Sequence, residues 1–321
     1  MNRYNTEKTR LSILLVTYNH EKFIRKAMDS IFKQDIKKPI ELVIADDASS
    51  DETLSIIKEY EGKDARIKFR YLDSSVNLGI TKNYQRGFSA CLSEYIAILE
   101  GDDYWVSPKK LLRQEFFLDN HWECDLCSVN YFVYEEYQSN FYPRTTVGEG
   151  YRLVSARELI ADNLVGNFST CMYRKSALEK LPNNLFEICS YDWIVNICVA
   201  RDSLIGFLEE PMSVYRLHTN GVWSQTPFVE QLKKQLELIP EYDLLTEKVF
   251  QKEFHILSKK LKHAVYGSQV TDVTSVISLP IIEFSKRLVE FSPPVLLLVF
   301  RVLTPPILKK IILKIIQRGA S

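Results

Sequence analysis

Short apolar runs alternate with amphipathic segments along the first half of the chain. Five runs are long enough to form buried strands: Leu11–Val16, Ile40–Ala45, Ile67–Leu72, Tyr95–Leu99 and Leu126–Tyr134. Between them, apolar side chains recur at helical spacing after Lys22, over Thr81–Cys91 and after the pair Ser107-Pro108. This alternation predicts an α/β fold, with a mostly parallel, doubly wound sheet and helices on both of its faces.

The pattern is less regular in the second half. It predicts helices over residues 155–163 and 190–200, and strands over residues 169–173, 204–208 and 212–217. After Pro227 the apolar spacing is almost wholly helical, at least as far as Lys262. We therefore expect an α/β domain over residues 1–226 and a helical C-terminal region over residues 227–321.

Composition narrows the class of protein. Hydrophobic residues make up 46% and charged residues 26% of 321 residues, which is typical of a folded domain. Lys+Arg and Asp+Glu both number 41, so no net charge draws the chain to nucleic acid.

The N-terminus, Met1–Arg10, is polar and lacks a secretory signal, so the six cysteines are expected to be reduced thiols in the cytoplasm. Cys124 and Cys127 form a CxxC pair, interpreted as buried thiols because zinc needs about four ligands.

The C-terminal tail concentrates positive charge. Residues 281–321 carry seven bases and two acids, and from Ile307 onward the apolar side chains fall on one helical face. Lys310, Lys314 and Arg318 fall on the opposite face. Such a helix suits an anionic membrane surface, which predicts peripheral attachment to the inner face of the cell membrane through residues 281–318. The alternative is a helix that packs on the rest of the protein or on a second subunit.

Polar residues follow three of the predicted strands. The clusters are Thr17-Tyr18-Asn19-His20, Asp46-Asp47 and Glu100-Gly101-Asp102-Asp103. Ligands of parallel sheets bind beyond the carboxyl ends of the strands, although each cluster alone could be ordinary turn chemistry. Adjacent carboxylates repel, so Asp102 and Asp103 favour a cation such as Mg²⁺ or Mn²⁺ shared with a phosphate group. Asp47 and Tyr18 suit a nucleobase. No GxGxxG or GxxxxGK[ST] motif occurs, which argues against dinucleotide oxidoreductases and P-loop enzymes.

These motifs, together with Asn77-Leu78-Gly79 and Tyr104-Trp105, resemble in order and spacing those of family 2 glycosyltransferases. The resemblance covers about Leu11–Ser224. It implies a GT-A fold for the domain over residues 1–226 and an inverting transfer from a nucleotide-diphosphate sugar.

The resemblance also implies roles for individual residues. The nucleotide would contact Thr17, Tyr18, Asn19, Asp46, Asp47, Lys82 and Asp102, with Tyr18 stacked on the base, Asp47 hydrogen-bonded to it and Asp46 bracing the turn. Asp102 and Asp103 would bind the metal, Arg216 and His218 would close over the diphosphate, and Asp192 would be the catalytic base. The role of Glu100 is left open. His20 is interpreted as solvent-facing or structural.

The chemistry that the resemblance implies is a single displacement. Asp192 would take the proton of an acceptor hydroxyl as that oxygen attacks the sugar. Because Asp192 begins a predicted helix, the helix dipole is expected to keep it ionised, although it could also be a plain helix cap. A UDP-sugar donor and a lipid-linked or growing saccharide acceptor, as in surface polysaccharide synthesis, fit best. A nucleotidyltransferase and a non-catalytic nucleotide-sugar binding protein remain alternatives.

Overall fold

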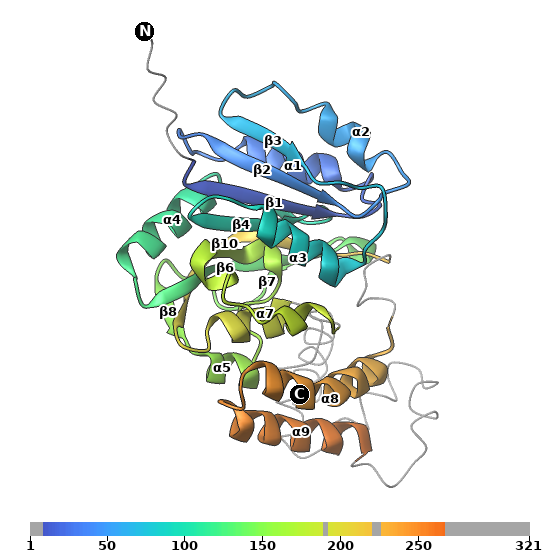
Figure 1. The fold of residues 1–321 in the computed structure, drawn as a ribbon, viewed down its shortest axis with the longest axis vertical. Coiled ribbons are helices and arrows are strands. Elements are labelled where there is room, and N and C mark those ends of the chain that lie inside the picture. Colours follow the sequence, from blue (N-terminus) through green and yellow to red (C-terminus); the bar gives the residue numbers. More distant parts are fainter. Residues whose placement is uncertain (1–8, 189–191, 220–225, 267–321) are drawn as a thin grey trace, which may run out of the picture. The chain divides into compact units, whose positions relative to one another are not determined.

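The computed structural model describes residues 9–188, 192–219 and 226–266 (Figure 1). The chain divides into two compact units, the first made of Met1–Leu159 and Leu164–Arg216, the second of Ile160–Asn163 and Leu217–Ser321. This division after Arg216 precedes the expected boundary at residue 226. The amphipathic helix expected in residues 281–318 lies outside the described residues.

The first unit begins with four parallel strands. These are β1 (Leu11–Thr17), β2 (Ile40–Asp46), β3 (Ile67–Tyr71) and β4 (Tyr95–Glu100), and they lie side by side in the order β3-β2-β1-β4. The order means that the chain moves outward from β1 through β3 and then returns to the other side of β1. In open α/β sheets, ligands bind where the order reverses, which here is at the carboxyl ends of β1 and β4.

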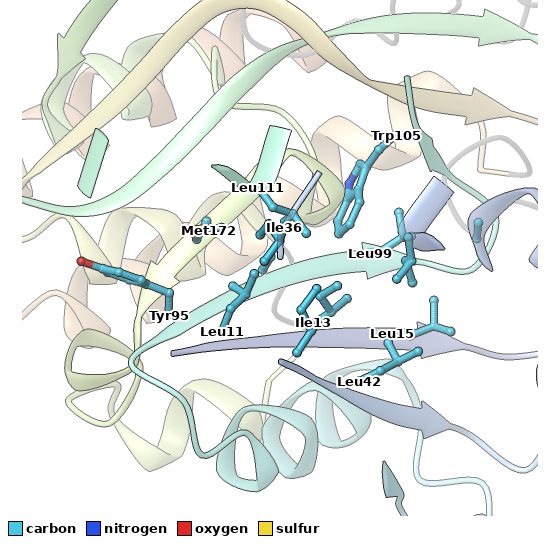
Figure 2. Packing of buried hydrophobic residues seen from close by; sticks show 14 of the residues in the cluster. Leu11, Ile13, Leu15, Ile36, Leu42, Tyr95, Leu99, Trp105, Leu111 and Met172 are labelled. Carbon is cyan, nitrogen blue, oxygen red and sulfur yellow. The ribbon is translucent and has the colours of Figure 1, made fainter. Parts of the chain in front are cut away.

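Helices cover both faces of these strands. On one face, Ile13 and Leu15 of β1 share a buried cluster with residues of α1 (Ile24–Phe32), α2 (Thr53–Lys58) and α4 (Lys110–Asn120). Figure 2 shows part of this cluster, including Leu42 and Leu99 of the neighbouring strands. On the other face, Leu14 packs so closely against Gly87 of α3 (Ile80–Ala90) that a Cβ there would lie 2.7 Å from it. The predicted doubly wound arrangement is therefore present in this part of the sheet.

The remaining strands add antiparallel pairs to the sheet. They are β5 (Tyr104–Trp105), β6 (Cys124–Glu135), β7 (Asn140–Pro143), β8 (Tyr151–Val154), β9 (Cys171–Arg174) and β10 (Leu204–Leu217). The sheet continues from β4 as β9-β6-β10-β5, with β7 on β6 and β8 on β10. The α/β prediction is confirmed, but the described sheet is mixed, so "mostly parallel" holds for its N-terminal half alone.

Strand β10 joins two strands that the sequence pattern predicts separately. Pro211 interrupts that pattern and lacks a backbone N–H. It lies between the residues that pair with β8 (Ile205–Leu208) and those that pair with β5 (Ser213 and Val214). Because neither of these two pairings needs a donor at Pro211, one continuous strand forms across it.

Short helices complete the first unit. They are α5 (Ala156–Ala161), which runs into the second unit, α6 (Lys175–Leu178), α7 (Asp192–Val199) and the 3₁₀ turns Glu136–Gln138, Phe168–Thr170 and Asn183–Phe186. The second unit contains α8 (Phe228–Leu245) and α9 (Gln251–Tyr266), which pack on each other. Within the described part of the chain, no helix is long and apolar enough to cross a bilayer.

The five cysteines that the structure describes are free thiols. Cys91, Cys124, Cys127 and Cys171 are buried, which agrees with the interpretation of the CxxC pair. Burial raises the pKa of Cys124 to about 12, so this thiol stays protonated and unreactive.

A lysine is buried in the core of the first unit. Lys110, the first residue of α4, is 0% exposed; its Nζ donates to Gln114 Oε1 at 2.8 Å and lies 4.4 Å from the ring centre of Trp105. Burial lowers the pKa of Lys110 to about 7. The folded state therefore favours the neutral amine, whereas the unfolded chain favours the ammonium form.

We expect Lys110→Met to change how stability depends on pH. As the pH falls from 10 to 7, Lys110 becomes protonated in the unfolded wild type but only weakly in the folded wild type. The free energy of unfolding of the wild type should therefore fall, relative to that of the variant, by on the order of a few kcal/mol. Denaturant unfolding at both pH values measures this difference. Lys109→Met, at the exposed neighbouring position, is the control. A stability difference between Lys110→Met and wild type that does not vary with pH would contradict the argument.

Candidate active site

The three polar clusters of the sequence follow β1, β2 and β4, which lie side by side in the sheet (Figure 1), so their carboxyl ends share one edge. Thr17 lies opposite Asp46 in the β1–β2 ladder. Just beyond the strands, Asp47 N donates to Thr17 O at 2.9 Å, and Gly101 N donates to Val16 O at 2.8 Å. Strand register therefore places the first cluster between the other two.

The turn after β2 is held by side chains. The carboxylate of Asp46 accepts hydrogen bonds from the backbone and hydroxyl of Ser49, so in this structure Asp46 fixes the turn. Asn19 Oδ1 accepts from Ser50 N at 2.8 Å and so ties the β1 loop to this turn. Asn19 and Ala48 have left-handed backbones, with φ of 53° and 62°. This conformation is costly for Ala48, and strain of this kind is characteristic of functional loops.

The predicted base-binding residues differ in accessibility. Tyr18 has 48% of its surface exposed, so its ring can receive a flat ligand. Asp47 is 3% exposed, and its two oxygens accept hydrogen bonds from Leu78 N at 2.8 Å and Gly79 N at 2.9 Å. In this structure Asp47 orders the 77–79 loop, and its contact with a base stays a prediction.

The acidic cluster after β4 separates into a buried and an accessible carboxylate. Asp103 is 1% exposed, and its oxygens accept from Arg216 N at 2.9 Å and Asn167 Nδ2 at 3.0 Å. The side chain of Asp102 is 22% exposed. Burial and the charge of Asp102 raise the pKa of Asp103 well above its usual range, and they raise the pKa of Glu100 to about 8. Asp102 is therefore the carboxylate of this pair that is placed to meet a ligand.

The acidic cluster fits a divalent cation that is shared with a ligand. In the described part of the chain, no three His, Cys, Asp or Glu side chains group closely enough to hold a metal by themselves. Magnesium and manganese sites in nucleotide enzymes, however, use one or two carboxylates and complete their shell with phosphate oxygens. Burial, together with the negative charge of Asp102, raises the pKa values of Glu100 and Asp103, and a cation would offset that repulsion.

Arg216 lies against the same cluster. Its Nε donates to Asp102 O at 2.9 Å, and its guanidinium carbon lies 4.9 Å from the ring centre of Phe23 and 5.5 Å from those of Tyr104 and Tyr134. The side chain is 8% exposed. Aromatic rings and a carbonyl thus hold the predicted diphosphate-binding arginine beside Asp102. His218 belongs to the second unit, and its role stays a prediction.

Asp192, the predicted base, is the first described residue of α7. Its Oδ1 accepts from Trp193 N at 2.7 Å. Burial raises the pKa of Asp192 to about 7, so the expectation that the helix dipole keeps it fully ionised is wrong: loss of hydration outweighs the dipole. Its charge in turn raises the pKa of Glu100 and Tyr84, which shows that Asp192 lies within electrostatic reach of the acidic cluster.

Three further residues near the site, Lys82, His20 and Asn167, make contacts that the sequence pattern does not indicate. Lys82, expected to reach a phosphate, forms an exposed ion pair with Glu187, a contact of little energy that a ligand could replace. His20, dismissed on the sequence as a lone histidine, has its Nε2 3.8 Å from Asp102 Oδ2. Asn167 holds Asp103. His20 directly follows the motif Thr17-Tyr18-Asn19, and this position could have marked it as a site residue. No local sequence pattern marks Asn167 in this way.

Comparisons with known proteins follow the same motifs. The family model "Glycosyl transferase family 2" matches residues 12–182, which is more than half of the chain. An uncharacterized protein of Mycobacterium tuberculosis is 36% identical over 66% of this chain, and the match spans 60% of that relative. The chain is also 33% identical over 30% of its length to the GalNAc(5)-diNAcBac-PP-undecaprenol beta-1,3-glucosyltransferase of Campylobacter jejuni, of which it covers 31%.

Solved structures share the fold. TarS of Staphylococcus aureus in complex with UDP-GlcNAc superimposes with a TM-score of 0.63 at 18% identity, over 87% of this chain and 79% of that one. A mannosyltransferase of Pyrobaculum calidifontis in complex with GDP-Man and Mn²⁺ gives 0.58 at 13% identity, over 90% and 82%. The family match, the curated relatives and the four motifs at one sheet edge together lead to one conclusion: this chain belongs to glycosyl transferase family 2.

Proposed function

We propose that this chain is a metal-dependent inverting glycosyltransferase that moves a sugar from a UDP-sugar to a hydroxyl acceptor. The observation that carries the proposal is the placement of Asp192, whose pKa is about 7, within electrostatic reach of the acidic cluster after β4. A base that titrates near neutral pH is half deprotonated at working pH and still basic enough to accept a proton. One base within electrostatic reach of one acidic cluster supports a single displacement.

The chain's own residues would act as follows. Tyr18 stacks on the base of the donor, and the loop ordered by Asp47 borders it. Asp102 faces the diphosphate, and Arg216 adds positive charge from its aromatic surroundings. Asp192 removes the proton of the acceptor hydroxyl as that oxygen attacks the sugar carbon. A divalent cation bound at Asp102 would offset the charge that develops on the departing diphosphate.

The donor and acceptor are inferred by analogy. A relative of the same fold binds UDP-GlcNAc, and another relative acts on an undecaprenol-linked saccharide. We therefore favour a UDP-sugar donor and a lipid-linked or growing saccharide acceptor in surface polysaccharide synthesis. A lipid-linked acceptor agrees with attachment of the basic tail to the cytoplasmic face of the membrane.

Two conservative variants should separate donor binding from transfer. Asp192→Asn should bind UDP with Mn²⁺ as the wild type does but lose about 10²–10⁴-fold in transfer, because proton removal alone is disabled. Asp102→Asn should lose the Mn²⁺-dependent part of UDP binding. Thermal shift with UDP, GDP and dTDP reports binding, since a ligand at a hundred times its Kd stabilises by roughly 2.7 kcal/mol. If Asp192→Asn transferred the sugar at the wild-type rate, Asp192 would not be the catalytic base.

Asp192 should also make stability depend on pH. Its folded-state pKa of about 7 lies above the ordinary aspartate value of 3.8, so the folded state favours the protonated acid. The wild type should therefore lose stability relative to Asp192→Asn as pH rises from 4 to 7, by on the order of a few kcal/mol. Metal-free denaturant unfolding at these pH values measures the difference, and Asp202→Asn, an exposed position, is the control. Equal pH slopes for wild type and Asp192→Asn would show an ordinary, solvated carboxylate.

The tail should carry membrane attachment. A protein lacking residues 281–321 should stay in the supernatant when sedimented with phosphatidylserine vesicles, whereas the full chain should pellet at low salt and be released as salt screens the bases. Replacing Lys310, Lys314 and Arg318 together by glutamine should release it as well. If the shortened protein unfolds, the tail is part of the folded protein. If the full chain never pellets with the vesicles, the tail does not attach it to a membrane.

A further inference from the structure

His20 is held in one orientation by several independent contacts. Its backbone N–H donates to Thr53 Oγ1 at 2.8 Å, its ring Nδ1 lies 3.1 Å from Thr17 Oγ1, and the edge of its ring meets Phe23. These contacts leave Nε2 directed at Asp102 Oδ2, 3.8 Å away. The ring is thus oriented by its contacts with Thr17 and Phe23, and the hydrogen bond to Thr53 fixes the backbone from which it extends.

The distance between His20 Nε2 and Asp102 Oδ2 suits a metal ion that bridges them. A separation of 3.8 Å is too long for a hydrogen bond, yet two metal–ligand bonds of about 2.1 Å each can bridge it. The His20 side chain is 19% exposed and that of Asp102 is 22% exposed, so both can be reached from solvent. By contrast, Asp103 is only 1% exposed and cannot be reached in this way.

The backbone is shaped to admit the imidazole. A Cβ on Gly101 would lie 2.7 Å from His20 Nδ1 and 2.6 Å from Thr17 Oγ1, closer than any side chain tolerates. Gly101 is therefore required for the chain to pass directly over the pair formed by Thr17 and His20. Its position immediately before Asp102 links this packing to the acidic cluster.

We propose that His20 Nε2 and Asp102 together ligate the divalent cation, the remaining positions being filled by the donor diphosphate and water. This inference rests on the metal-dependent transfer proposed above. The imidazole binds as the neutral tautomer with its proton on Nδ1, which donates to Thr17 Oγ1; metal-bound histidines are commonly fixed by such a second hydrogen bond. Replacing one oxygen ligand by imidazole favours Mn²⁺ over Mg²⁺, because Mg²⁺ prefers oxygen ligands.

The test is the magnetic resonance of Mn²⁺ bound to the full-length protein with UDP. Pulsed measurements should detect coupling of the manganese electrons to a histidine nitrogen in the wild type, and this coupling should vanish in His20→Gln. Titration should show at least about a tenfold loss of Mn²⁺ affinity in that variant, by comparison with the 10- to 100-fold typical of weaker, outer contacts. His20→Asp, which supplies an oxygen, should recover binding and shift the preference toward Mg²⁺.

Controls separate this inference from its rivals. His255→Gln, at an exposed position of α9, should leave coupling and affinity unchanged. Coupling that survives in His20→Gln, or that disappears in His218→Gln instead, overturns the assignment. Bound Mn²⁺ without nitrogen coupling in the wild type overturns it too, as does a failure to bind Mn²⁺ with UDP or GDP. Sugar transfer that continues in the presence of a chelator overturns both the metal ligands and the metal dependence of the proposed function, while the transferase activity itself stands.

Discussion

The buried carboxylate of Asp103 is the interaction on which the geometry of the site depends. It accepts hydrogen bonds from the backbone of Arg216 in β10 and from the side chain of Asn167 before the turn Phe168–Thr170. Two segments distant in sequence are thereby fixed to the end of β4. The buried carboxyl group is tolerated because these donors replace its lost water, and removing either donor would leave one of its oxygens buried without a hydrogen bond. The outward position of Asp102 and the seat of Arg216 follow from this anchor.

The sequence predicts the parallel half of the fold well because its strands are buried on both faces. Their apolar runs are continuous, and their order follows from the alternation with helices. The antiparallel half is harder to predict, because its pairings join residues far apart in sequence. Strand β9, for example, inserts between β4 and β6, and nothing local to Cys171–Arg174 encodes those neighbours. Pro211 likewise hides the continuity of β10, because its tolerance depends on where partner strands begin and end.

For the site, the sequence identifies the residue types and the sheet edge but does not resolve what each carboxylate contacts. Asp46 and Asp47 are adjacent and chemically alike, yet one braces the following turn and the other orders the 77–79 loop. Asp102 and Asp103 are alike in the same way, yet Asp103 is buried and hydrogen-bonded to Arg216 and Asn167, whereas Asp102 is partly exposed. His20 follows β1 and lies near Asp102, which follows β4, so no local sequence pattern reveals this pair. The pKa of Asp192 depends on the surrounding core, which opposes the helix dipole and outweighs it.

The site holds several unfavourable features in one place. Glu100, Asp103 and Asp192 all have raised pKa values, and Ala48 adopts a left-handed backbone. None of these helps the chain to fold, and the apolar core beneath β1 and β4 supplies the stability that tolerates them. Each acid would be relieved by positive charge brought in with a ligand, because a cation offsets the carboxylates that repel one another. Under the proposed function, a cation that enters with the donor would therefore stabilise the bound state relative to the empty one.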